Sequence, residues 1–160
     1  MHAATGERID GRRDYCAAVE RVLALASLHV ALYSPRLPGY AYGSRAGVET
    51  LKNWLITTPR ARTRILVHEP RYAMSEPNRL ILLGLRLSSS VSFRDAPSRL
   101  EPFGDRLIVD GRHVLIRPQP DSTSATLWLD SPLKAREELM RFDKLWEEST
   151  SSIEIRNRTI

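Results

Sequence analysis

The chain has 160 residues, of which 42% are hydrophobic and 27% are charged, a composition typical of a globular domain with its own core. No apolar run approaches the roughly 20 residues that a membrane-spanning helix needs, and no secretory signal follows Met1. Cys16 is the only cysteine, which excludes an internal disulfide. These features predict one soluble domain in the reducing cytoplasm, without membrane contact.

The net charge is +5, and almost all of the basic side chains are arginine. Most of the excess lies between Arg60 and Arg117, whereas the segment around Glu137 and Glu148 is acidic. Because arginine forks suit phosphate and carboxylate groups, the excess indicates a surface for an anion or nucleic acid. No run of five or six basic residues occurs, however, and charges spread over a solvated surface explain the same excess.

The first part of the chain alternates between helical and strand patterns. After a flexible tail over residues 1–13, apolar residues at helical spacing predict a helix over residues 15–27, followed by a buried strand over 28–33. Further along, the pattern predicts a helix over 48–55, a strand over 65–67, a helix over 77–87 opened by Pro77, and a strand over 91–94. Such alternation requires crossover connections and predicts a mixed, mostly parallel sheet flanked by helices on both faces.

From Asp105 onward the pattern becomes that of an antiparallel hairpin. Strands over residues 106–109 and 113–116 flank Asp110-Gly111, a strong signal for a two-residue turn. A strand over 125–129 and a helix that begins at Ser131-Pro132 complete a domain that we place at residues 14–148. Residues 149–160 form a C-terminal tail without clear periodicity.

This order of elements resembles one repeat of the phospholipase D superfamily, over roughly residues 15–146. In that superfamily the first arm of the hairpin carries His-x-Lys-x-x-x-x-Asp, and the second arm ends in a Gly-Ser-x-Asn turn that lines the same pocket. Aligning Asp110 with the aspartate places Phe103 at the histidine, Asp105 at the lysine and Arg117-Pro118 near the Gly-Ser turn. The resemblance implies an α/β fold built as a single repeat. It also implies a homodimer, because single-repeat members pair their repeats across a two-fold axis.

The aligned side chains do not supply the chemistry of the superfamily. Its histidine attacks phosphorus, and the phenyl ring of Phe103 has no lone pair with which to do so. Its lysine neutralises phosphoryl oxygens, which the carboxylate of Asp105 would repel. No His-x-Lys occurs anywhere in the chain. The alignment therefore predicts a pseudoenzyme.

Three segments are also similar to uncharacterised bacterial phospholipase D-like domains that are sometimes found beside acetyltransferase domains. These segments are residues 65–70, 115–118 and 142–147. The similarity implies no particular activity.

Several polar residues are candidates for binding an anion. His113 and Arg117 alternate onto one face of the same predicted strand, and Arg117 falls where the superfamily has its pocket. His68 follows the strand over residues 65–67, at the end where open α/β sheets bind ligands. Tyr33 and Ser34 close the preceding strand at the same end.

Structural roles explain the same residues equally well. Arg117 is able to form an ion network with Asp105, Asp110 or Asp121, and a lone histidine at a strand end is more often structural than functional. Asp105 and Asp110 point to opposite faces of a strand, and no His or Cys pair has the spacing of metal ligands. We therefore expect neither a metal nor a cofactor.

Three functions remain open on the sequence. The favoured one is a binding module for a phosphorylated ligand, a nucleic acid or a protein partner. The second is a docking subunit that uses the acidic last helix or the segment Ile153-Glu-Ile155. The third is a phosphoester hydrolase rebuilt around Arg117, His113 and the two aspartates of the hairpin.

Overall fold

The computed structural model describes residues 6–120 and 122–156. Its centre is an eight-stranded sheet with the order β1-β7-β6-β5-β2-β3-β4-β8. The strands are β1 (Glu7–Asp10), β2 (His29–Tyr33), β3 (Arg62–Val67), β4 (Val91–Asp95), β5 (Arg106–Val109), β6 (His113–Ile116), β7 (Ser124–Trp128) and β8 (Thr150–Ser151). The helices are α1 (Arg12–Leu23), α2 (Gly39–Tyr42), α3 (Arg45–Thr57), α4 (Pro70–Ala73), α5 (Arg79–Arg86), α6 (Pro132–Glu148) and α7 (Ile153–Arg156).

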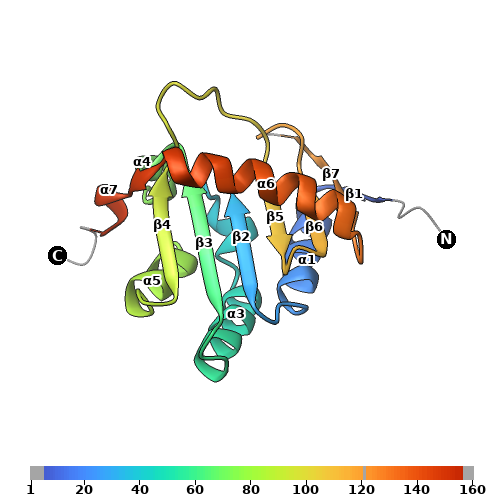
Figure 1. Cartoon of the computed structure of the whole chain (residues 1–160), viewed down its shortest axis with the longest axis horizontal. Helices are drawn as coiled ribbons and strands as arrows, with labels where there is room; N and C mark the ends of the chain where they lie inside the picture. The colour runs from blue at the N-terminus through green and yellow to red at the C-terminus, as the bar shows by residue number, and fades with distance from the viewer. Residues whose placement is uncertain (1–5, 121, 157–160) are drawn as a thin grey trace.

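Helices cover both faces of the sheet, but unequally (Figure 1). α1, α3 and α5 lie behind the sheet, where an apolar cluster includes Val19, Leu51 and Ile65. The long helix α6 crosses the front face over a smaller cluster that includes Ile108 and Phe142. Successive side chains of a strand point to opposite faces, so apolar strands such as β5 contribute to both clusters. The predicted α/β fold with helices on both faces is confirmed.

The prediction that the sheet is mostly parallel is wrong. Only β2 with β3 and β3 with β4 pair in parallel among the described residues. The other neighbouring pairs are antiparallel. Helical connections between neighbouring strands of the sheet join only β2 to β3 and β3 to β4 in the described structure. The strands β5, β6 and β7 follow one another through turns and loops, and the two ends of the chain add β1 and β8 at the edges.

Both predicted tails are partly built into the domain. β1 pairs with β7 and α1 begins at Arg12, so the prediction of a flexible tail over residues 1–13 is wrong for residues 7–13. At the other end, β8 pairs with β4, and Ile155 of α7 is only 1% exposed. The predicted boundary at residue 148 is therefore too early. Residues 1–5 and 157–160 of the two predicted tails lie outside the described residues.

Local capping explains where one helix departs from its prediction. α5 begins at Arg79 rather than at Pro77, because the side chain of Asn78 accepts a hydrogen bond from the Leu80 N–H at 3.0 Å and caps the helix. The single-turn helices α2 and α4 were not predicted, since one turn is too short to show a period. No helix in the described ranges combines the length and apolar character that crossing a bilayer requires.

The predicted hairpin of β5 and β6 is confirmed, and it positions the candidate site. Asp110 and Gly111 have φ angles of 56° and 62°, the left-handed conformation that a tight two-residue turn needs. The strands pair from Val109 opposite His113 to Arg106 opposite Ile116. The residues that follow this ladder, Asp105 and Arg117, therefore meet at the open end of the hairpin.

Candidate functional site

A buried ion pair occupies the open end of the hairpin. Arg117 Nη2 donates to Asp105 Oδ2 at 2.9 Å, and the backbone N–H of Arg117 donates to the Asp105 carbonyl at the same distance. The two residues are 5% and 1% exposed. Of the alternatives that the sequence left open for Arg117, the structure shows the pair with Asp105.

Hydroxyl groups from two other segments complete the surroundings of the Asp105 carboxylate. Ser34, at the end of β2, donates to Oδ2 at 2.8 Å, and Tyr42 of α2 donates to the same oxygen at 2.5 Å. Because the Tyr42 proton is used in this way, Tyr15 of α1 donates to the Tyr42 hydroxyl. The carboxylate is thus held by neutral donors and by one cation.

Burial and pairing act in opposite directions on the ionisation of this group. Burial raises the pKa of the Asp105 carboxyl above its ordinary value, although Arg117 and the donors Tyr42 and Ser34 oppose the shift. Burial alone would lower the pKa of Arg117, but the Asp105 charge raises it, and the net shift is upward. Burial also raises the pKa of Tyr15 and of Tyr42, which keeps both phenols protonated.

A glycine lets the two arms of the hairpin come this close. A Cβ atom at Gly104 would lie 1.7 Å from the carbonyl oxygen of Arg117 and 2.3 Å from the carbonyl carbon of Pro118. Both are backbone atoms, so a side chain at residue 104 would force the arms apart. The ion pair of Asp105 and Arg117 depends on this approach.

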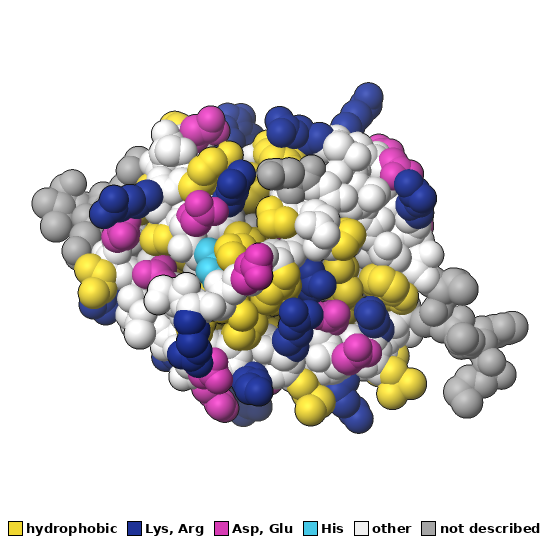
Figure 2. Space-filling model, turned by 90° about the horizontal axis from the view of Figure 1, so that it is seen from above, with side chains coloured by type: hydrophobic (Ala, Val, Ile, Leu, Met, Phe, Trp, Pro, Cys, Tyr) yellow, Lys and Arg dark blue, Asp and Glu magenta, His cyan; other side chains and the backbone are white. Residues whose placement is uncertain are grey.

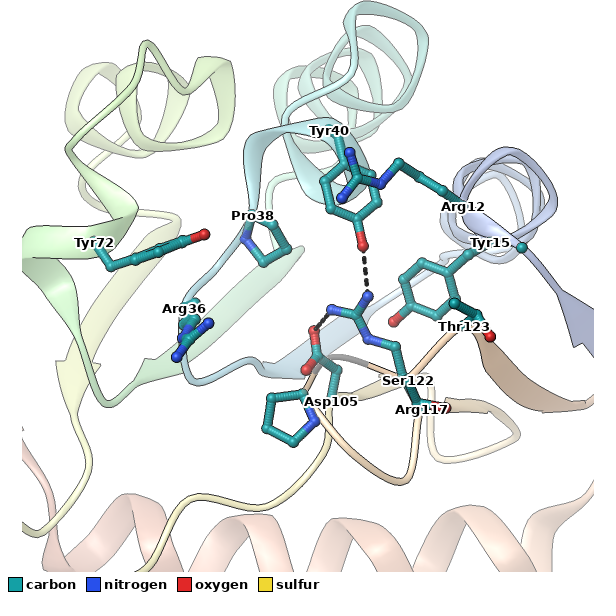
Figure 3. Close-up of a pocket in the computed structure, with 12 residues that line it drawn as sticks. Arg12, Tyr15, Arg36, Pro38, Tyr40, Tyr72, Asp105, Arg117, Ser122 and Thr123 are labelled. Carbon is teal, nitrogen blue, oxygen red and sulfur yellow. Dashed lines mark hydrogen bonds and ion pairs between the residues drawn. The ribbon is translucent and has the colours of Figure 1, made fainter.

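A cavity of about 240 Å³ opens beside the ion pair (Figure 3). Asp105 and Arg117 lie at its centre, Tyr15 and Tyr40 on the side of α1 and α2, and Tyr72 on the opposite side. Further lining residues are Gly11, Arg12, Arg36, Pro38, Pro120, Ser122 and Thr123. The cavity therefore combines three arginines with three tyrosines.

The balance of charge in the cavity is positive. Arg117 pairs with Asp105, and Arg36 pairs with Glu69 at 3.1 Å. Arg12 lies 4.0 Å above the Tyr40 ring and has no carboxylate partner among the residues that the structure describes. Arg12 is also the first residue of α1, whose amino end follows Gly11 without a side-chain cap. The unpaired guanidinium and the partial positive charge of the helix end both favour an anion here.

The wider surface around this end of the sheet is of mixed charge. Figure 2 looks onto it and shows basic side chains interspersed with acidic ones around hydrophobic patches. No broad basic face surrounds the cavity in this view. Attraction of an anion to this end would therefore depend on the local arginines rather than on a general field.

Phe103, which the sequence alignment predicts at the position of the superfamily's histidine, does not line the cavity. Its ring stacks on Tyr33 with 4.0 Å between centroids, and the guanidinium of Arg141 lies 4.0 Å from the centroid of the Phe103 ring. The Tyr33 hydroxyl accepts the Phe103 N–H at 3.3 Å, and burial raises the pKa of Tyr33 to about 12. Phe103 and Tyr33 therefore belong to the packing beneath α6.

His68 also lies with this aromatic group. Its ring is edge-on to Tyr33 at 5.6 Å, its Nε2 atom is buried without a hydrogen-bond partner in the described structure, and burial lowers its pKa. Of the predicted ligand-binding residues Arg117, His113, His68, Tyr33 and Ser34, only Arg117 and Ser34 contact Asp105.

His113 and Asp110 lie at the turn of the hairpin, away from the cavity. His113 accepts the Asp130 N–H through Nδ1 at 3.0 Å. The Asp110 carboxylate accepts the N–H groups of Ser27, Leu28 and His29 at 2.8–2.9 Å and the Ser27 hydroxyl at 3.0 Å. Burial opposes the charge of Asp110, but these donors prevail and lower its pKa. The structure does not bring the candidates His113 and Arg117 together, because they lie at opposite ends of β6.

The sequence does not single out Arg12 or the cavity tyrosines Tyr15, Tyr40 and Tyr72 as site residues. Arg12 falls within the predicted flexible tail. No local signal joins α1, α2 and the hairpin, since they meet only in the folded chain. The described residues contain no group of three His, Cys, Asp or Glu side chains placed to hold a metal.

Known structures with a similar fold include phospholipase D relatives. Nuc from Salmonella typhimurium, a phospholipase D family member, matches with a TM-score of 0.58 and 14% identity over 92% of this chain and 99% of its own. NucT from Helicobacter pylori matches with a TM-score of 0.63 and 10% identity over the same shares. TrmBL2, an archaeal chromatin protein described as binding DNA in a novel mode, matches with a TM-score of 0.65 and 12% identity over 92% of this chain.

These likenesses establish the fold alone, since all three identities are low. The chain spans 54% of the length of TrmBL2. No curated protein sequence matches it. The family model described as "Domain of unknown function (DUF7931)" matches residues 11–157. With nearly its whole length in that match and a phospholipase D-like fold, the chain belongs to the DUF7931 family.

Proposed function

We propose that the protein is a non-catalytic phospholipase D-like module that binds a phosphorylated ligand in the cavity beside Asp105 and Arg117. The observation that carries the proposal is the buried ion pair of Asp105 and Arg117 next to a cavity lined by Arg12, a guanidinium without a carboxylate partner in the described part of the chain. The family match and the fold likenesses support the module, and the cavity supports the ligand class.

The residue aligned with the superfamily's nucleophile has no lone pair to supply. Phe103 is packed between Tyr33 and Arg141 and is not part of the cavity lining. Asp105 already accepts three hydrogen bonds on one oxygen, from Ser34, Tyr42 and Arg117. A carboxylate held in this way is a poor base, and its charge disfavours attack on a phosphate.

The same arrangement suits recognition of phosphate. Arg12 offers an unpaired guanidinium at the rim, and its fork matches phosphoryl oxygens. Tyr40 donates no proton to Arg117, since Arg117 Nη1 donates to the Tyr40 hydroxyl at 2.5 Å, so the phenol proton is left for another acceptor. Ser122 and Thr123 add polar groups on the far wall.

Stabilisation by phosphate compounds tests the proposal. Inorganic phosphate and pyrophosphate should raise the thermal midpoint of the wild-type protein, whereas Arg12→Gln should lose most of this effect. Arg45→Gln removes an equally exposed charge at the start of α3, away from the cavity, and should leave the effect unchanged. Equal responses of the two variants would contradict a site at the cavity.

A second candidate function is docking to a protein partner, as the sequence also allowed. Leu133 and Met140 of α6 are 82% and 67% exposed, and their spacing of seven residues places them on one face of the helix. Ile155 is buried, so the segment Ile153-Glu-Ile155 is not free to dock as a whole.

Sedimentation tests whether the face of α6 with Leu133 and Met140 forms a homodimer, by comparing the wild type with Leu133→Glu. Dissociation of a dimer in the variant would support docking.

A further inference from the structure

In the described part of the chain, no helix crosses the front of the sheet below α6 (Figure 1). α6 crosses the strands near one end, and β2, β3 and β4 begin below it. A depression of about 610 Å³ occupies this region and continues around the edge of β4. We call it the β4 groove. It is separate from the cavity at Asp105, with which it shares no lining residue.

The side chains of the β4 groove carry positive charge. Four arginines line it and no acidic residue does: Arg62, Arg64, Arg94 and Arg156. Arg64 pairs with Asp143 at 2.7 Å and donates to His29. The other three have no carboxylate partner within the described ranges, and Arg62 and Arg94 donate to backbone carbonyls instead. The groove therefore attracts anions more strongly than the mixed surface at the other end.

An aromatic ring and hydroxyl groups accompany the arginines. Trp146 of α6 is partly exposed at the upper border of the groove, with the Arg94 guanidinium 4.7 Å from its ring centroid. Five serines also line the groove: Ser88, Ser90, Ser92, Ser151 and Ser152. Guanidinium groups and hydroxyls contact phosphates. Phe142 stacks on the Trp146 ring and the Arg64 guanidinium also lies over it, at 5.5 Å, so a base would pack against the exposed edge of the indole.

The spacing of the arginines selects the kind of anion. Arg62 begins β3, and Arg94 lies opposite Leu66 four residues further along that strand, so their backbones are about 13 Å apart along the strands. A ligand with one phosphate contacts only part of this row, whereas a chain that repeats its phosphates contacts all of it. A duplex keeps its bases stacked inside, which leaves none for Trp146.

We propose that the β4 groove is a second binding site, which takes a single strand of nucleic acid with its phosphates on the arginines and a base near Trp146. This proposal does not depend on the ligand of the cavity at Asp105. The nucleic acid would lie on the face of the sheet below α6. The residues that contact it there are not those aligned with the superfamily motif.

Fluorescence anisotropy with a labelled oligothymidylate of about 12 nucleotides tests the proposal on the full chain. The double variant Arg62→Glu with Arg156→Glu changes two exposed groove arginines. Its matched control is Arg13→Glu with Arg45→Glu, which changes the net charge equally on the side of α1 and α3. The groove variant should bind at least tenfold more weakly. The slope of its log binding constant against log salt concentration should be shallower by about 1.4, because two phosphate contacts are lost and each contributes about 0.7 for a single strand.

Two further measurements separate a strand from any polyanion. The oligonucleotide should quench tryptophan fluorescence, and Trp146→Phe should abolish most of the quenching although Trp54 and Trp128 remain. A duplex of the same length and polyglutamate should both bind more weakly. Equal losses in the groove and control variants, or equal binding of polyglutamate, would overturn the proposal. Arg12→Gln should leave oligonucleotide binding unchanged, so this result is independent of the phosphate test of the cavity.

Discussion

The two ends of the β5–β6 hairpin each carry an aspartate, yet the two carboxylates differ in what they contact. At the turn, Asp110 accepts four hydrogen bonds from residues 27–29. At the open end, Asp105, which the sequence alignment predicts at the position of the superfamily's lysine, pairs with Arg117. The aspartate at the turn has a structural role that does not need catalysis.

The predicted alignment would make the charges at the open end rearranged rather than lost. A lysine at residue 105 would place a cation there, whereas this chain has the cation at residue 117 and an anion at residue 105. The two charges compensate each other in a site that is almost completely buried. Either one alone would leave an unpaired charge.

Breaking the ion pair should give the largest effect on stability. Asp105→Ala leaves the Arg117 guanidinium buried without its counter-charge and should lower the free energy of unfolding by about 3–5 kcal/mol. The double variant Asp105→Leu with Arg117→Met removes both charges and should be close to neutral or stabilising. Urea denaturation measures both. A double variant as unstable as the single one would contradict the compensation.

Arg117→Met, which removes the other partner of the ion pair, should lower the stability by an amount that depends on pH. Without Arg117, burial alone acts on Asp105, so its already raised pKa rises further in the folded state. When an acid has a raised pKa in the folded state, its protonation stabilises the folded protein relative to the unfolded chain. This contribution to the free energy of unfolding is lost as the pH rises through the folded pKa. Arg117→Met should therefore be most destabilising at neutral pH and least near pH 4. A loss independent of pH would show that Asp105 does not carry the charge.

The turn should respond more weakly, because Asp110 is partly exposed. Asp110→Ala removes the acceptor of the four donors and places alanine at a φ of 56°, which should cost about 1–3 kcal/mol. Asn tolerates that φ, so Asp110→Asn tests the charge with less strain and should cost less. The lowered pKa of Asp110 means that its stabilisation is present above about pH 4 and is lost below it. Denaturation at pH 7 and pH 3 checks both parts.

The smallest effect should come from His68. Burial lowers the pKa of His68 in the folded protein. Its contribution to the free energy of unfolding is therefore complete above the pKa of about 6.5 in the unfolded chain, and it declines as the pH falls through the folded pKa. His68→Phe should flatten this decline in unfolding measurements between pH 7 and pH 5. His29 also has a pKa lowered by burial and by Arg64, and it accounts for the decline that remains. An unchanged profile would mean that His68 does not titrate in this range.

Local sequence signals predicted the elements better than their arrangement. The Asp110-Gly111 turn and the paired strands on either side were predictable because the turn requires a positive φ that few residues adopt. The antiparallel majority of the sheet was not, because β1 and β8 are short and find their partners only in the folded chain. Single-turn helices such as α2 likewise leave no period to detect.

The site was only half predictable for a similar reason. Asp105 and Arg117 follow from the motif alignment and the pairing of the hairpin arms, which the sequence contains. Arg12, Tyr40 and Tyr72 reach the cavity from α1, α2 and α4, and no spacing in the chain connects them. His113 and Arg117 show the limit of alternation, which predicts that two residues share a face of a strand but not that they share an end of it.

The central claim, binding without catalysis, is tested most directly by ³¹P NMR of bis(4-nitrophenyl) phosphate mixed with the protein at near-equal concentration. The account predicts that the phosphodiester resonance broadens or shifts with the wild type, that Arg12→Gln reduces this change, and that no monoester resonance appears over days. A growing monoester resonance, dependent on Asp105 or Arg117, would contradict the claim by showing catalysis. An unperturbed phosphodiester resonance would contradict it by showing that the cavity binds no phosphate.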